Sequence, residues 1–400
     1  MKEVQPVTFA EARRCVVQTV RAARSVPAAE DVPLDACEGR VLARDIPADR
    51  DYPPVSRSLR DGFAVRAADL PGELRVIGEV RAGERFDGEV RPGEAVEIMT
   101  GAPVPPGADA VVMVEHTVCE AGRVRIASGG EAGQFINAGG VEVRAGQPVV
   151  RAGARIDYAA VAMLATVGCV AVPVFRRPEV AIVPTGDEVV EAGSVPREYQ
   201  VRNSNAYSLA AQTRRAGGVP RVLPVARDDE AHTRALVEQG LAADLLLLSG
   251  GVSAGKYDVV ERVLAGLGAE FFFDRVLIQP GQPLVFGRAR GKFFFGLPGN
   301  PASTMVTFEL FARTALELLA GLEEPTLPMP LARLTADFRH KPGLTRFLPA
   351  RLSPDGGDVT PVAWRGSSDV PALSRANAYL VADSERAAWA AGDLIRVLLK

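Results

Sequence analysis

The 400-residue sequence is poor in the residues that build sulfur- and nitrogen-ligated metal sites. No two of its four cysteines are close enough for a CxxC motif; they are Cys15, Cys37, Cys119 and Cys169. Its three histidines are equally scattered; they are His116, His232 and His340. This spacing argues against a zinc site, and we expect the cysteines to be reduced structural thiols.

The sequence also lacks a basic surplus and a long apolar run. The net charge is −3, whereas a nucleic-acid-binding protein needs a basic surplus on at least one domain. The most apolar stretch, 161–175, contains Gly168 and Pro173 and is shorter than the roughly 20 residues of a membrane span. The first 17 residues contain no apolar segment typical of a signal peptide. We therefore expect a cytoplasmic protein that binds neither nucleic acid nor a membrane.

The first half of the chain changes its pattern twice, which predicts more than one domain. Residues 8–45 have apolar positions at helical spacing, and 157–168 predict another helix. Residues 46–140 are rich in Gly and Pro and contain short alternating runs, as strands do. We assign 1–45 and 141–175 to an elongated helical domain and 46–140 to an inserted β-rich module.

The second half alternates strand-like and helix-like segments. Strands are expected at 179–184, 220–226, 244–249 and 269–278, followed by a hairpin at 284–299. Helices are expected at 204–216, 230–240, 257–267 and 301–319. This alternation predicts a doubly wound, parallel α/β domain over 176–325. Residues 326–400 alternate like strands again and predict a C-terminal β-barrel or sandwich.

Three loops follow strands of the expected parallel sheet, where ligands bind in such folds. They span 185–188, 249–255 and 296–303, and each is rich in glycine or small hydroxyl residues. Any one of them is also consistent with an ordinary tight turn. Together they predict a site for a phosphate- or pterin-sized ligand, because glycines let the backbone approach and free N–H groups favour anions.

The middle loop resembles a phosphate-binding P-loop, with Gly250, Gly255 and Lys256 in the right order. The next residue is Tyr257 instead of the Ser or Thr that holds Mg²⁺, which disfavours an ordinary NTPase. Carboxylates follow the strand ends and suit Mg²⁺; they are Asp187, Glu188, Asp228, Asp229 and Asp258. Asp228 and Asp229 are equally consistent with a helix cap.

Several motifs, in order along the whole chain, resemble the MoeA and gephyrin E-domain family. Residues 58–64 read SLRDGFA, close to that family's S-M-D-G-Y-A signature, and 98–105 read IMTGAPVP. PTGDE, SGGVS-x-G-x-x-D and GLPGNPAS follow in family order. The resemblance implies a transferase that inserts molybdenum from molybdate into adenylated molybdopterin and releases AMP, assisted by Mg²⁺. It also implies a pterin-binding α/β domain, a C-terminal β-barrel, contact with the molybdopterin adenylyltransferase, and a homodimer formed through the elongated domain.

The resemblance also implies roles for individual residues. Asp61 and Thr100, in the β-rich module, would face the partner subunit's cleft, and Glu142 would keep a carboxylate of the family. All three are expected to act in catalysis. Glu188, Asp228 and Asp258 would act in catalysis and hold the metal ion. The expected substrate-binding residues are Thr185, Gly186, Asp187, Ser249, Gly250, Gly251, Ser253, Gly255, Pro283, Pro298, Gly299, Asn300, Ser303 and Ser368.

The expected oxyanion site departs from the family pattern. Gln279 and Gln282 stand where the family commonly has lysines, and residues 343–349 lack two expected arginines. We expect the glutamines to bind the anion as neutral donors, with Arg275, Arg346 and Arg351 as candidates to compensate. The departure favours one alternative, a related enzyme that uses another oxyanion such as tungstate. The resemblance to gephyrin leaves a second alternative, a scaffold without catalysis.

Overall fold

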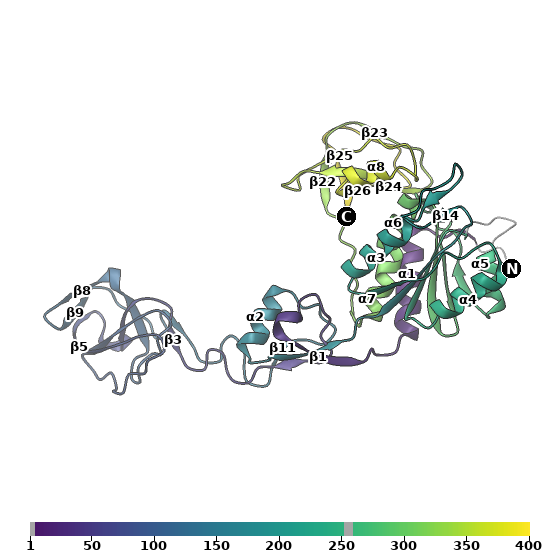
Figure 1. Cartoon of the computed structure of the whole chain (residues 1–400). Helices are drawn as coiled ribbons and strands as arrows, with labels where there is room; N and C mark the ends of the chain where they lie inside the picture. The colour runs from purple at the N-terminus through teal and green to yellow at the C-terminus, as the bar shows by residue number, and fades with distance from the viewer. Residues whose placement is uncertain (1–4, 252–258) are drawn as a thin grey trace.

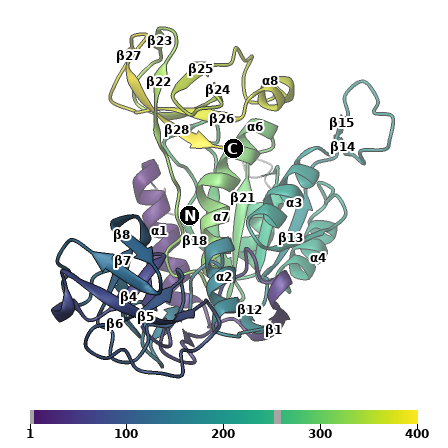
Figure 2. The same cartoon turned by 90° about the vertical axis from the view of Figure 1, so that its left-hand side faces the viewer.

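The computed structural model describes residues 5–251 and 259–400, which form an elongated molecule. Figure 1 shows a β-rich module at one end, a narrow connecting region in the middle, and an α/β domain with a β-barrel beside it at the other end. The view in Figure 2 looks along this long axis, with the β-rich module nearest the viewer. The β-rich module and the α/β domain of one chain therefore lie far apart.

The N-terminal helix α1 (Phe9–Ala23) belongs to the core of the α/β domain. Thr8 and Glu11 form a capping box that fixes its first turn. Its buried face, Ala12, Val16 and Val20, packs in one cluster with the helices after β21. The prediction of helix throughout 8–45 is wrong beyond Ala23, because the chain there is extended and pairs with β12.

The connecting region is built from short extended pairs and one helix. Its elements are β1 (Ala29–Pro33), η1 (Leu34–Ala36), β2 (Ile46–Pro47), β11 (Pro148–Val150), α2 (Tyr158–Thr166) and β12 (Ala171–Phe175). β1 pairs with β12 and β2 with β11, both antiparallel, so two segments far apart in sequence run side by side. The helix predicted at 157–168 is α2, with Asp157 as its N-cap.

The β-rich module predicted within 46–140 contains a six-stranded sheet in the order β7-β4-β6-β5-β9-β8. Two small apolar clusters cover its faces. A short pair, β3 with β10, lies beside it. The elements are β3 (Arg57–Ser58), β4 (Gly62–Val65), η2 (Ala67–Asp69), β5 (Gly72–Val80), β6 (Glu94–Ile98), β7 (Ala110–Met113), η3 (Val114–His116), β8 (Thr117–Glu120), β9 (Arg123–Ile126) and β10 (Ile136–Asn137).

The α/β domain contains a second six-stranded sheet, in the order β16-β13-β17-β21-β20-β18. The first four strands are parallel, as predicted. β20 runs antiparallel to both of its neighbours, because it forms the predicted hairpin with β21, and β18 pairs with its other edge. The strands are β13 (Glu179–Pro184), β16 (Val219–Val222), β17 (Leu245–Ser249), β18 (Glu270–Phe273), β20 (Val285–Ala289) and β21 (Lys292–Leu297).

Helices cover both faces of this sheet, so the doubly wound arrangement is confirmed. Alternate residues of β17 face opposite sides: Leu245 and Leu247 pack with α1, α3 and the last helices, and Leu246 and Leu248 with α4 and α5. The helices are α3 (Asn205–Arg215), α4 (Glu230–Gly240), α5 (Val259–Gly266), α6 (Pro301–Thr307), the π-helical turn η4 (Phe308–Ala312) and α7 (Arg313–Leu319).

The C-terminal region forms a closed barrel. Its strands follow the order β24-β25-β22-β28-β26, and a further pairing of β24 with β26 closes the ring, which decides between barrel and sandwich. β19 (Ile278–Gln279) from the α/β domain adds outside β24. The elements are β22 (Leu331–Leu334), β23 (Phe338–Arg339), β24 (Thr345–Leu352), β25 (Asp358–Pro361), α8 (Val370–Arg375), β26 (Ala378–Ala382), β27 (Ala388–Trp389) and β28 (Leu394–Leu399).

No helix among residues 5–251 and 259–400 has the length and apolarity needed to cross a membrane. The four cysteines are unpaired, as predicted.

Candidate functional site

A cavity of about 600 Å³ lies at the carboxyl ends of the adjacent parallel strands β13, β17 and β21. The three loops predicted to bind a ligand meet there, as expected for a sheet of this kind. The predicted site residues that line the cavity are Thr185, Glu188, Ser249, Gly250, Gly251, Pro283, Pro298, Gly299, Asn300 and Ser368. Ser368 comes from the barrel, so the site is shared between two parts of the chain.

Backbone hydrogen bonds hold the three loops together. The Thr185 N–H donates to the Ser249 carbonyl at 3.0 Å, and the Thr185 hydroxyl donates to the same oxygen at 3.4 Å. The Gly250 N–H donates to the Leu297 carbonyl at 3.1 Å. The described floor of the cavity is therefore an extension of the sheet.

Glycine is required at position 250 of this floor for steric reasons. Gly250 has φ +97°, and a Cβ there would lie 2.9 Å from the Thr185 carbonyl oxygen. A Cβ on Gly299 would lie 3.6 Å from the Gly250 Cα, so the backbones of the second and third loops are nearly in contact. The floor thus presents main-chain groups instead of side chains, as suits a flat ring or a phosphate group.

Glu188 is the acidic side chain lining the described part of the cavity. Its carboxylate lies against Gly186, whose φ is +122° and where a Cβ would lie 2.4 Å from Glu188 Oε2. Asp187 and Asp228 stand beside the cavity without lining it, and the Asp228 N–H donates to Asp187 Oδ1 at 3.3 Å. Asp229 caps α4 by accepting from the His232 N–H, which was the alternative reading for this residue.

Sequence reasoning missed the cavity wall formed by Arg202, Asn203, Ser204 and Asn205. The sequence predicts only a helix from Ser204 onward here. The cluster of small polar residues just before α3 was the available signal. The long connection between β13 and α3 forms two short parallel strands, β14 (Val189–Val190) and β15 (Val201–Arg202), and these bring the stretch to the rim.

Asn205 joins two of the cavity loops. Its Nδ2 donates to the Gly299 carbonyl at 2.7 Å and to Ser249 Oγ at 2.9 Å. Because a carbonyl can only accept, this contact fixes the orientation of the amide. Oδ1 is buried and has no hydrogen-bond partner among the described residues. A donor on a ligand, such as a ring N–H, would satisfy it after a small shift of the side chain.

Several predicted substrate residues lie outside the cavity. Ser303 is 5% exposed within α6. Arg275, Gln279 and Gln282 occupy the connection between β18 and β20, of which Pro283 lines the cavity. The further predicted residues Ser253, Gly255 and Asp258 lie outside the described residues.

The expected oxyanion residues fall into two groups. Gln279 and Arg346 are direct neighbours in the parallel pair of β19 and β24. Arg346 Nε is buried without a hydrogen-bond partner in the described part of the chain. Arg351 lies five residues further along β24, opposite Thr360. An odd offset along a strand points the two arginines to opposite faces, so only Arg346 accompanies Gln279.

The predicted residues of the β-rich module form a separate, exposed pair. Thr100 donates to Asp61 Oδ1 through both its N–H and its hydroxyl, each at 2.6 Å. The hydroxyl bond, followed by the N–H bond, lowers the pKa of the Asp61 carboxyl below its usual range. The Ser58 carbonyl also accepts from the Gly101 N–H at 2.8 Å, which joins the segment before Asp61 to the segment after Thr100. Asp61 is therefore held as an exposed carboxylate.

Glu142 lies between the β-rich module and the connecting region, where Asn137 Nδ2 donates to it at 2.8 Å. None of the residues Glu142, Asp61 and Thr100 lines the cavity of the α/β domain. The β-rich module, which carries Asp61 and Thr100, lies at the opposite end of the molecule (Figure 1).

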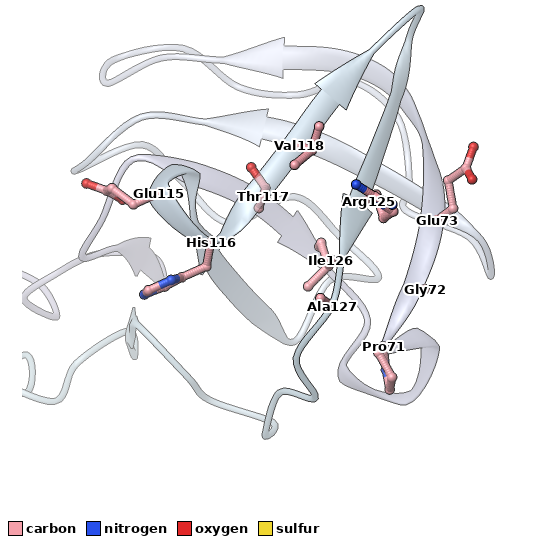
Figure 3. A pocket seen from close by; sticks show the side chains of 10 residues that line it. All are labelled: Pro71, Gly72, Glu73, Glu115, His116, Thr117, Val118, Arg125, Ile126 and Ala127. Atoms are coloured by element: carbon pink, nitrogen blue, oxygen red, sulfur yellow. The ribbon is translucent and has the colours of Figure 1, made fainter.

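A second pocket, of about 730 Å³, lies in the β-rich module between β5, β8 and β9. Figure 3 shows Glu73, Glu115 and His116 at its edges, pointing away from one another. A small-molecule site needs a few polar groups that converge on one point. The cavity at the strand ends meets this requirement and the second pocket does not.

Comparisons with known proteins agree with this geometry. Three family models match: the MoeA N-terminal region (domains I and II) over 7–168, a probable molybdopterin-binding domain over 181–318, and the MoeA C-terminal region (domain IV) over 331–400. The cavity loops that the structure describes fall within the second match, except Ser368 of the barrel.

Curated relatives cover nearly the whole chain. The molybdopterin molybdenumtransferase of Bacillus subtilis is 35% identical over 92% of this chain and 89% of its own length. That of Staphylococcus aureus is 32% identical over 97% and 94%. A crystal structure of a molybdopterin biosynthesis MoeA protein from Pyrococcus horikoshii matches with a TM-score of 0.84 and 29% identity, over 99% of this chain and 100% of that one. The chain therefore belongs to the molybdopterin molybdenumtransferase (MoeA) family.

Proposed function

We propose that this chain is the transferase that inserts molybdenum from molybdate into adenylated molybdopterin and releases AMP. The observation that carries the proposal is the glycine-floored cavity formed by the described parts of three loops at the ends of adjacent parallel strands. Its size suits a pterin, its backbone floor suits phosphate groups, and the buried Asn205 Oδ1 offers an acceptor for a ring N–H. The names of the curated relatives support the same substrate class.

The chain's own residues supply binding and orientation. The floor at Gly250 and Gly299 would hold the phosphate-bearing end of the substrate close to the backbone, and at Gly250 there is no room for a side chain. Asn205 would fix the ring by a single directed hydrogen bond. Thr185 and Ser249 keep the two loops in register. Positioning of this kind lowers the entropy cost of bringing the pterin and the oxyanion together.

Mg²⁺ is part of the proposal, and the described residues fit it in a limited way. They contain no group of three or more His, Cys, Asp or Glu side chains that would hold a metal ion alone. Mg²⁺ is commonly held by one or two carboxylates together with substrate phosphates. Glu188 in the cavity and Asp228 on the adjoining loop would supply these carboxylates, with Asp258 as a third candidate. The ion would neutralise charge on the phosphate groups.

An insertion assay tests the proposed function. Purified protein is mixed with adenylated molybdopterin, Mg²⁺ and molybdate, and the release of AMP and the formation of active cofactor are followed together. Molybdate-dependent release of both supports the transferase. AMP release with tungstate but not molybdate would support the alternative that the glutamines at 279 and 282 suggest. Tight binding without turnover would leave the scaffold role.

The oxyanion site gives a testable prediction. Arg346 lies beside Gln279 and has a buried, unsatisfied Nε within the described chain, whereas Arg351 faces away. We expect Arg346→Ala to weaken molybdate binding about ten- to hundredfold, because a hydrogen bond to a charged group contributes about 1.5–3 kcal/mol. Arg351→Ala is the matched control and should leave affinity within about twofold, measured by isothermal titration. Unchanged affinity in both variants would remove the arginines from the anion site.

A homodimer is also proposed, because Asp61, Thr100 and Glu142 are remote from the cavity of their own chain. A second copy could place them at its rim. The exposed side of α2 supports this arrangement. Helices that are apolar all round are normally buried, yet among the residues of α2 only Leu164 is buried, and Tyr158 is 83% exposed.

Substitution on α2 tests the dimer. Ala162 is exposed, so Ala162→Asp should leave the fold of one chain intact and place a charge in the apolar interface. We expect the variant to sediment as a monomer and to lose most of its activity, since the proposed site needs two chains. Ala235→Asp, at an exposed alanine of α4, should sediment as the unchanged protein does. A dimeric Ala162→Asp protein would contradict this interface.

A further inference from the structure

The charge of the cavity is unusual for a site that is to hold a substrate with several phosphate charges. Among its described lining residues, the charged side chains are Glu188 and Arg202. Arg202 is the last residue of β15 and pairs with Val190 of β14. Val190 follows Glu188 by two residues, so the two charged side chains belong to neighbouring segments. Gln279 and Gln282 of the expected oxyanion site carry no charge. Arg202 is therefore the positive charge that the described part of the cavity offers to a phosphate.

Most of the hydrogen-bonding capacity of Arg202 is free. Within the described chain its side chain makes one hydrogen bond, from Nε to the Ser194 carbonyl at 3.0 Å. A guanidinium has five N–H donors, so the four at the two terminal nitrogens remain. Those four form the flat fork that binds two phosphate oxygens at once. No described carboxylate pairs with Arg202 to neutralise it.

The same side chain holds a loop. Residues 191–200 connect β14 with β15 and project from the molecule, as Figure 2 shows at its right-hand side. Val195 is 88% exposed and Tyr199 is 84% exposed, so the tip of the loop has little packing of its own. The bond from Arg202 to Ser194 links this loop to the wall of the cavity.

We propose that Arg202 binds the phosphate groups of the nucleotide-linked substrate and, through Ser194, couples their binding to the order of the 191–200 loop. The proposal rests on the proposed function for the identity of the phosphate-bearing substrate. The first expected consequence is that substitution of Arg202 lowers the affinity for the phosphate groups, because a charged bidentate contact is lost. The second is that phosphate binding makes the 191–200 loop more ordered, because a guanidinium fixed by phosphate holds Ser194 more firmly.

Affinity is measured by isothermal titration with two probes, inorganic pyrophosphate and adenylated molybdopterin. Arg202→Gln should weaken the binding of both about ten- to hundredfold. Raising the salt concentration should weaken binding less in the variant than in the original protein, because one ionic contact is missing. Arg214→Gln is the matched control: it removes the same charge from an exposed site on α3, away from the cavity, and should leave both affinities within about threefold.

The loop is followed by limited trypsin digestion at Arg197, an exposed residue, with mass spectrometry of the fragments. Pyrophosphate should slow this cleavage in the original protein and not in Arg202→Gln. Arg202→Lys separates phosphate binding from the link to Ser194. Lysine keeps the positive charge, but its single ammonium group cannot bind a phosphate and also replace the Nε–H bond to the Ser194 carbonyl. It should retain part of the affinity and lose the protection of the loop.

Each outcome bears on the inference. Equal affinity of Arg202→Gln and the original protein for pyrophosphate would overturn it, and so would an original protein that binds neither probe. Binding of pyrophosphate through Arg202 without any binding of adenylated molybdopterin would instead reject the proposed function and leave the phosphate role of Arg202 standing. Loss of affinity without any change in the cleavage at Arg197 would remove the coupling to the loop.

Discussion

Arg313→Met should lower the free energy of unfolding by about 3–5 kcal/mol, the usual cost of leaving a buried charge without its partner. Arg313 lies between two buried carboxylates, with Nη1 3.2 Å from Glu309 Oε2 and Nε 3.1 Å from Glu317 Oε1. Both glutamates are 5% exposed. After the substitution, Glu309 would keep the Gln212 amide and Glu317 a longer contact to Arg155, at 3.4 Å.

The measurement is thermal unfolding followed by circular dichroism, in which a loss of this size lowers the midpoint by roughly 10 °C. Arg288→Met is the matched control, because Arg288 pairs with Glu270 on the surface and such pairs contribute about 0–1 kcal/mol. The triple variant Glu309→Gln, Glu317→Gln, Arg313→Met should recover most of the loss, since it removes the charges together. An unfolding midpoint unchanged by Arg313→Met would contradict this prediction. It would mean that the contacts to Gln212 and Arg155 are enough to stabilise the two buried carboxylates.

Glu188→Gln should reduce the rate of AMP release about a hundredfold or more. Glu188 is the carboxylate that lines the described cavity, and its position depends on the absence of a side chain at Gly186. If it helps to hold Mg²⁺, its loss removes part of an electrostatic stabilisation of several kcal/mol, and each 1.4 kcal/mol corresponds to about tenfold in rate. The assay is the release of AMP from adenylated molybdopterin at several Mg²⁺ concentrations.

A neighbouring residue provides the control for this variant. Glu191 is exposed, three residues along the chain, and does not line the cavity. Glu191→Gln removes the same charge and should leave the rate within about twofold. Partial recovery of Glu188→Gln at high Mg²⁺ would support a role in metal binding, whereas full activity at ordinary Mg²⁺ would exclude Glu188 from the reaction.

Local signals in the sequence predicted the α/β domain well. Two helices of that domain have a start that the sequence marks, with Asp229 before α4 and Pro301 at the first turn of α6. The buried strand β17 reads as an unbroken apolar run, as parallel strands covered on both faces do. The three loops after the strands were recognisable by their glycines and small hydroxyl residues, and at Gly250 the backbone requires glycine.

Other parts depended on contacts between distant residues. The chain beyond Ala23 is extended because β1 pairs with β12, more than a hundred residues away. The barrel closes through the pairing of β24 with β26, which no local pattern distinguishes from an open sandwich. Arg346 reaches Gln279 only because β19 leaves the α/β domain and joins the barrel.

The sequence by itself determined the order of the elements, the loops at the strand ends and the resemblance to the MoeA family, because these depend on turns, caps and motifs a few residues long. Only the tertiary structure decided which predicted residues meet. It brought Arg202 and Asn205 into the cavity wall, separated Arg351 from Arg346, and kept Asp61 and Thr100 far from the cavity of their own chain. The physical reason is that side-chain proximity here follows from strand pairing and packing over long separations in sequence, which local patterns do not record.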